Sequence, residues 1–90
     1  MLTGKQMREA LLCLLDDTKK KSITWIPTNR GFKISLKDYH FFLFTKGKKS
    51  RTEIFAAQIK TKPIYVAWLR PGSENYDVLA LLSHELQKPN

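Results

Sequence analysis

The chain has 90 residues, of which 42% are hydrophobic and 11% aromatic, and its formal net charge at pH 7 is +8. This length fits one domain, residues 1–90, and the composition argues against a disordered chain. Cys13 is the single cysteine, which excludes an internal disulfide and predicts an intracellular, cytoplasmic protein.

The N-terminal segment carries an amphipathic helical pattern. Thr3 and Gln6 have the spacing of a capping box. An apolar stripe at helical spacing comprises Leu2, Met7, Ala10, Leu11, Leu14 and Leu15. Arg8 and Glu9 interrupt the apolar residues, and no run approaches the ~18 that a membrane span needs. We therefore expect a helix over residues 3–18, with neither a signal peptide nor a membrane partner.

The pattern then changes to short segments typical of strands. The stretch "SITWIPTNRGFKISL" predicts two strands around a turn at Asn29-Arg30-Gly31, where Gly31 is able to adopt a positive φ. Pro27 has no N–H for a strand ladder, so the first of these strands should lie at an edge of the sheet.

The sequence predicts one more strand in the middle of the chain and a second helix near the C-terminus. "YHFFLFT" is rich in aromatic residues and predicts a strand, separated from the one before it by a bulge or tight turn at Lys37-Asp38. Near the C-terminus, Ser73 is placed to cap a helix over about 74–87. The apolar stripe of that helix is Tyr76, Leu79, Leu82 and Leu86.

The stretch "TKGKKSRTEIFAAQIKTK" and the following "PIYVAWL" allow two interpretations. In the one that we favour they are strands, with turns at Lys46–Lys49 and around Thr61–Pro63, because "PIYVAWL" is rich in β-branched and aromatic residues. The fold is then α+β, with an N-terminal helix, an antiparallel sheet of about four to five strands and a C-terminal helix. Two helices cannot cover a sheet that is apolar on both faces, so some apolar surface should be exposed or meet a partner, including a second copy of the chain.

In the alternative interpretation, residues 50–70 are helical. Ser50 and Glu53 have capping-box spacing, and Ala56-Ala57 favours helix. The fold would then be mainly α, with a β-hairpin and a helix-turn-helix at about 50–70.

The same segment resembles the helix-turn-helix pattern of phage-type repressors over some twenty residues. The residues that carry the resemblance are "FAAQI", Val66, Leu69 and Gly72. It implies core positions in a first helix for Phe55, Ala56 and Ile59, core positions in a recognition helix for Val66 and Leu69, and a role in transcriptional regulation. The sequence departs from the pattern at Lys60, where these motifs usually have a glycine.

The basic charge is concentrated in the middle of the chain. From Lys19 to Lys62 there are twelve Lys and Arg residues against only Asp38 and Glu53. The remaining residues carry four basic and six acidic side chains. This layout indicates a polyanionic partner, which would be nucleic acid (DNA or RNA) or an acidic protein surface.

The candidate contact residues are the cations of this middle segment that lie at turns and strand ends in the favoured fold. They are Arg30, Lys33, Lys46, Lys48, Lys49, Arg51, Lys60 and Lys62. Trp25, Phe42 and Tyr65 would add base-stacking groups if they faced outward, whereas core packing is the alternative for each.

Signals for catalysis, metal ions and cofactors are weak. His40 and His84 have the settings of structural or solvated histidines, and the leucines around Cys13 predict a packed, inert thiol. "GKKS" resembles the end of a phosphate loop, but Phe42 stands where the loop needs its first glycine. We therefore expect a small, basic, non-enzymatic nucleic-acid-binding protein that contacts mainly the phosphate backbone. The alternative is a small protein-binding inhibitor or regulator of a larger complex, of the kind encoded by phages and mobile elements.

Overall fold

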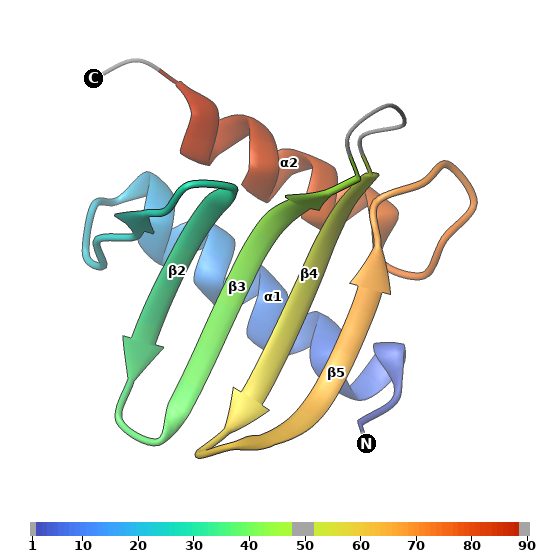
Figure 1. Ribbon diagram of the computed structural model, residues 1–90, viewed down its shortest axis with the longest axis horizontal. Helices are drawn as coiled ribbons and strands as arrows, with labels where there is room; N and C mark the ends of the chain where they lie inside the picture. Colours follow the sequence, from blue (N-terminus) through green and yellow to red (C-terminus); the bar gives the residue numbers. More distant parts are fainter. Residues whose placement is uncertain (1, 48–51, 89–90) are drawn as a thin grey trace.

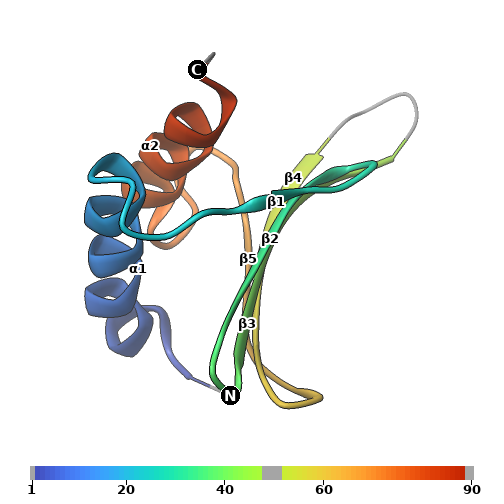
Figure 2. The ribbon, with the colours of Figure 1, turned by 90° about the vertical axis from the view of Figure 1, so that its left-hand side faces the viewer.

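Two helices cover one face of a five-stranded antiparallel sheet in the computed structural model, which describes residues 2–47 and 52–88 (Figures 1 and 2). The elements in chain order are α1 (Gly4–Lys19), β1 (Ile26–Pro27), β2 (Gly31–Leu36), β3 (Tyr39–Lys46), β4 (Thr52–Ile59), β5 (Lys62–Trp68) and α2 (Tyr76–Gln87). Each strand pairs with the next one along the chain, so the order in the sheet is the order in the sequence. The predicted α+β arrangement is confirmed.

The helix-turn-helix interpretation is wrong, because β4 and β5 are strands. Phe55 of β4 pairs with Leu43 on one side and with Ala67 on the other, which places β4 in the middle of the sheet. The Ala56-Ala57 pair and the capping-box spacing are compatible with helix, but the strand pairing outweighs them. It buries Ile54 and Phe55 on opposite faces of one strand. A single helix lying on the surface would have buried only one such stripe.

The predicted cap of α1 is present. The Gln6 amide nitrogen donates to the Thr3 hydroxyl over 3.2 Å, and the Thr3 amide nitrogen donates to Gln6 Oε1 over 2.9 Å. This reciprocal pair satisfies two donors at the end of the helix that otherwise have no partner. No helix formed by the described residues is long and apolar enough to cross a membrane.

The predicted cap of α2 is wrong. The helix begins at Tyr76, and its N-cap is Asn75, in the left-handed conformation with φ 59°, instead of Ser73. The Asn75 side-chain oxygen does not cap the helix and instead accepts a hydrogen bond from Arg8 Nη1 over 3.1 Å. The amide nitrogen of the same side chain donates to the Gly4 carbonyl oxygen and to the Tyr65 hydroxyl. The start of α2 is therefore fixed by contacts with α1 and β5.

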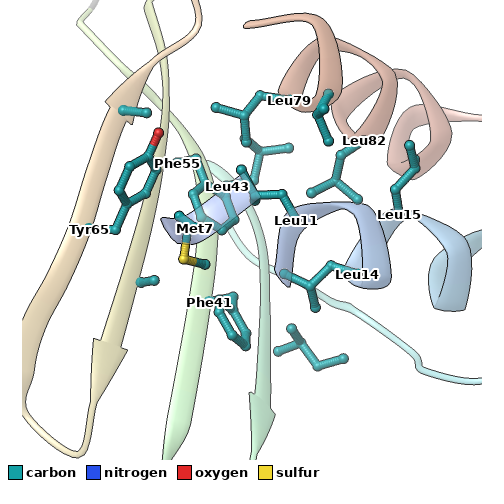
Figure 3. Packing of buried hydrophobic residues seen from close by; sticks show 14 of the residues in the cluster. Met7, Leu11, Leu14, Leu15, Phe41, Leu43, Phe55, Tyr65, Leu79 and Leu82 are labelled. Atoms are coloured by element: carbon teal, nitrogen blue, oxygen red, sulfur yellow. The ribbon is translucent and has the colours of Figure 1, made fainter. Parts of the chain in front are cut away.

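The hydrophobic core lies between the helices and the sheet (Figure 3). Its most deeply buried side chains come from α1, β4 and α2 and include Leu11, Phe55, Leu79 and Leu82, each with 0% exposure. Cys13 lies two residues beyond Leu11 on the opposite side of α1 and is exposed, so the prediction of a packed thiol is wrong.

The strand connections are short, and the predicted tight turn at Lys37-Asp38 is present. The first turn does lie at Asn29-Arg30-Gly31, and Pro27 is on the edge strand β1 as predicted. Gly31 does not have a positive φ, however; positive values occur instead at Lys37 (57°) and Lys60 (56°), in the tight turns before β3 and β5. Gly31 is required for another reason, because a Cβ there would collide with the backbone of β3.

Candidate nucleic-acid interface

The helices leave the second face of the sheet uncovered, and we call this surface the open face (Figure 2). Side chains alternate along β3, so Phe41 and Leu43 enter the core while Phe42 and Phe44 point to the other side. Because neighbouring strands keep the same alternation, the strand register assigns every described strand residue to one face or the other.

Apolar side chains form two adjacent rows across the open face. The first row contains Phe44, Ile54 and Trp68, which are paired across β3, β4 and β5. The second row contains Phe42, Ala56 and Val66 on the same strands. We call these six residues the sheet patch.

The sheet patch combines local packing with exposure to water. Ile54 is only 5% exposed, although it lies outside the core cluster, because its neighbours in the row flank it on both sides. Trp68 and Val66 are 40% and 46% exposed, whereas Ile26, which is 53% exposed on β1, is separated from the patch by Lys33. Contiguous exposed apolar side chains of this kind are typical of a binding surface.

Three cations border the sheet patch. The Arg70 guanidinium lies over the Trp68 ring, 4.8 Å from its centroid. Lys46 is two residues beyond Phe44 on β3 and therefore projects from the same face. Lys33 pairs directly with Phe42 in the β2–β3 register and is exposed. The patch is therefore apolar inside and positively charged along its border.

A polar row follows the sheet patch on its other side. Ser35, His40 and Gln58 are paired across β2, β3 and β4. Ser35 Oγ and His40 Nδ1 lie within hydrogen-bond distance, at 2.8 Å. This row presents hydrogen-bonding groups beside the apolar ones.

The structure separates the predicted contact residues into two groups. The Arg30 carbonyl oxygen accepts a hydrogen bond from the Thr45 amide over 2.8 Å, which places Arg30 beside the end of β3 that carries Lys46. Lys33 lies on the adjoining strand β2. Arg30 and Lys46 thus belong to one end of the sheet, Lys33 lies in its middle opposite Phe42, and the predicted residues Lys48, Lys49 and Arg51 lie outside the described residues.

Lys60 and Lys62 lie at the other end. The Lys60 amide donates to the Asp38 carbonyl oxygen over 2.7 Å, so the turn before β5 adjoins the turn before β3 (Figure 1). The eight residues of β3 separate the two ends by about 26 Å. Lys60 and Lys62 therefore lie at the opposite end of the sheet from Arg30 and Lys46.

The two layers differ in charge. Residues 26–70, which contain the whole sheet, hold ten of the sixteen basic residues and two of the eight acidic ones. One of these acids, Glu53, faces the helices, where its Oε1 accepts from Ser83 Oγ (2.9 Å) and Gln87 Nε2 (3.1 Å). The rest of the chain has six residues of each sign, so the net charge of the protein comes from the segment 26–70, of which residues 48–51 lie outside the described part.

Charges in the helical layer compensate one another. The ion pairs there are Arg8–Asp77 (2.6 Å), Lys20–Asp16 (2.9 Å) and Lys88–Glu85 (3.0 Å). The hydrogen bond from Arg8 is the main reason why the pKa of Asp77 is lowered to about 2, and the Val78 amide contributes. Lys19–Lys21, at the start of the basic middle segment, lie at the end of α1 and not on the sheet.

No family model, curated protein or solved structure matches this chain. The assignment of the candidate interface therefore depends on the geometry of this structure alone. Among residues 2–47 and 52–88, no three His, Cys, Asp or Glu side chains are grouped so that they could hold a metal ion.

Only one of the three predicted stacking residues faces outward. Trp25 and Tyr65 are 7% and 3% exposed and belong to the core, whereas Phe42 lies on the open face. Sequence reasoning missed Trp68 as a surface group, together with the Arg70 that covers it. Strict alternation in "YVAW" was the available signal, since it places Val66 and Trp68 on one side of β5 and Tyr65 and Ala67 on the other.

Proposed function

We propose that this protein binds nucleic acid without catalysing a reaction on it, and that most of its contacts are to the phosphate backbone. The observation that supports this proposal is the segregation of charge: residues 26–70, which contain the five strands, account for the net charge of +8, while the charges of the remaining residues sum to zero and include three ion pairs. A molecule charged on one side approaches a polyanion in one orientation.

The physical basis is counterion release. Lys and Arg side chains that neutralise phosphates displace condensed cations, which gives an affinity that is independent of sequence and falls steeply with salt. Arg30, Lys46 and Arg70 supply such cations at one end of the sheet, and Lys33 supplies another in its middle.

A salt titration tests the proposal. Fluorescence anisotropy with labelled random-sequence DNA and RNA should show affinity of about micromolar or tighter at low salt, decreasing linearly on a log–log plot. Charge reversal in the double variant Lys33→Glu/Lys46→Glu should reduce the slope of that plot by about 2. The matched control is Lys5→Glu/Lys19→Glu, which makes the same change of charge at exposed positions of α1 and should retain most of the binding.

Absence of binding at low salt by the folded protein would refute the proposal and favour the second candidate, docking of an acidic polypeptide. The outer edge of β5 supports that candidate. β5 is an edge strand of the sheet, and its outer side already accepts one backbone hydrogen bond, from the Leu2 amide to the Ile64 carbonyl oxygen over 2.6 Å. Such an edge can accept another strand.

A further inference from the structure

We infer that the sheet patch is a stacking platform for unpaired bases, and that the preferred ligand of this protein is single-stranded nucleic acid. The inference rests on the proposed function and specifies its ligand class and its site. It depends on the spacing of the aromatic rings, on the side chain beneath them and on the cations at the border.

The rings are spaced to receive more than one base. Phe44 and Trp68 lie in one row with Ile54 between them, two strand spacings or about 10 Å apart. Phe42 is two residues from Phe44 along β3, a distance of about 7 Å. Aromatic side chains at such separations offer distinct faces to successive bases, and base–aromatic stacking tolerates any sequence because every base has a π-face.

The platform is ordered before a ligand arrives. Ile54, 5% exposed, fills the space between the strands that carry Phe44 and Trp68. The Arg70 guanidinium, 4.8 Å from the Trp68 ring centroid, restrains the ring through a cation–π contact, while Trp68 remains 40% exposed. Side chains that are already held in place lose less conformational entropy on binding than free ones.

The border of the platform has the charge that a nucleic-acid strand requires. Lys46 lies beyond Phe44 on β3, Arg70 lies beyond Trp68, and Lys33 flanks Phe42 on β2. Bases placed on the apolar rows would leave their phosphates near these cations. The polar row that contains His40 and Gln58 offers hydrogen bonds to base edges on the opposite border.

The same geometry disfavours a duplex and a second copy of the chain. Base faces are hidden inside a duplex, and reading its grooves requires a projecting helix or ribbon, whereas α1 and α2 lie behind the sheet (Figure 2). An interface formed by the sheet patches of two copies would contain Lys33, Lys46 and Arg70 from both, and Glu53, the acidic residue of β4, faces the helices and does not offset them.

The test compares a dT homopolymer of 20 nucleotides with a duplex of equal length. The protein should bind the single strand at least about tenfold more tightly, and Trp68→Ala should lower that affinity by roughly 5- to 150-fold, the effect of losing one stacked base, without changing the salt slope. Trp68→Phe keeps an aromatic face and should retain most of the affinity. The control is Leu81→Ala, which removes a side chain that is 52% exposed on α2.

A second measurement does not depend on how Trp68→Ala folds. The sequence contains two tryptophans, so Trp25→Phe leaves Trp68 as the sole emitter, and dT should quench it. The inference is overturned if dT binds with unchanged Trp68 emission and Trp68→Ala binds like the wild type, an outcome that leaves the proposed function intact. Absence of binding to any nucleic acid would refute both the inference and the proposed function. A dimer in sedimentation equilibrium that Trp68→Ala dissociates would assign the patch to a second copy and would also overturn the inference.

Discussion

The side-chain amide of Asn75 donates a hydrogen bond to the Tyr65 hydroxyl over 3.1 Å. It also donates to the Gly4 carbonyl oxygen over 2.8 Å, so one side chain joins the start of α1, the start of α2 and strand β5. Asn75 is 8% exposed and has a φ of 59°, a conformation that Asn adopts more readily than most residues. Backbone conformation and hydrogen bonding thus require the same residue type.

Asn75→Ala should therefore destabilise the fold by about 2–5 kcal/mol. Loss of the amide leaves buried partners unsatisfied, which costs roughly 1–3 kcal/mol, and alanine in the left-handed conformation adds roughly 1–2 kcal/mol. Urea unfolding followed by circular dichroism gives the value. Asn75→Gly removes the hydrogen bonds but relieves the backbone, so its loss should be smaller; an effect below about 0.5 kcal/mol for both variants would contradict the role of Asn75.

Alanine should destabilise the fold much more at Gly31 than at Gly4. A Cβ at Gly31 would meet the Leu43 carbonyl group and the Phe44 backbone, so Gly31→Ala must displace β2 from β3 and should cost about 1–3 kcal/mol or more. A Cβ at Gly4 would meet only the side chain of Glu74, which can rotate away, and alanine is the better helix former. Gly4→Ala should change stability by less than about 1 kcal/mol; comparable losses in unfolding free energy for the two variants would contradict this distinction.

The ion pair between Arg8 and Asp77 predicts a pH dependence of stability. The folded pKa of Asp77 is lowered from 3.8 to about 2, chiefly by the Arg8 hydrogen bond. A lowered carboxyl pKa stabilises the fold above the unfolded pKa, and this stabilisation disappears as the pH falls through the folded pKa. The difference in unfolding free energy between wild type and Asp77→Asn should be constant from pH 7 to 5 and shrink between about pH 4 and pH 2.

Arg8→Met provides the control for that measurement, because it removes the partner and leaves the carboxyl. The double variant Arg8→Met/Asp77→Asn should lose less unfolding free energy than the sum of the losses in the two single variants, because each single variant already breaks the same ion pair. Both side chains of the pair are exposed to solvent, at 43% and 65%, so salt should also reduce the difference. A difference that persists unchanged at pH 1.5 would show that Asp77 acts through another contact.

Cys13 should react with thiol reagents in the folded protein. Its side chain is exposed on α1, so the reaction with Ellman's reagent should proceed at a rate close to that of the urea-unfolded chain. The matched control is Leu14→Cys with Cys13→Ser, which moves the thiol by one residue to a position that is 4% exposed. Protection of Cys13 comparable to that of the control would contradict the orientation of α1.

The local elements were predictable because their determinants are short-range. Thr3 and Gln6 cap α1 through a contact between residues three apart, and the aromatic run of β3 favours a strand whatever surrounds it. The segment of β4 was ambiguous, because its Ala56-Ala57 pair and capping-box spacing are compatible with helix. Pairing with β3 and β5 decided the matter, and that pairing brings together residues far apart in the sequence.

The sequence by itself determined the α+β class and the concentration of positive charge in the middle of the chain. It did not determine which face of the sheet is the binding face. Phe42 and Phe44 are as apolar as Phe41 and Leu43, and strand alternation alone does not distinguish the two sets. The packing of both helices on one side buried Phe41 and Leu43, left Phe42 and Phe44 on the open face, and placed Trp68 under Arg70 beside them. That choice depends on contacts between layers, which only the tertiary structure contains.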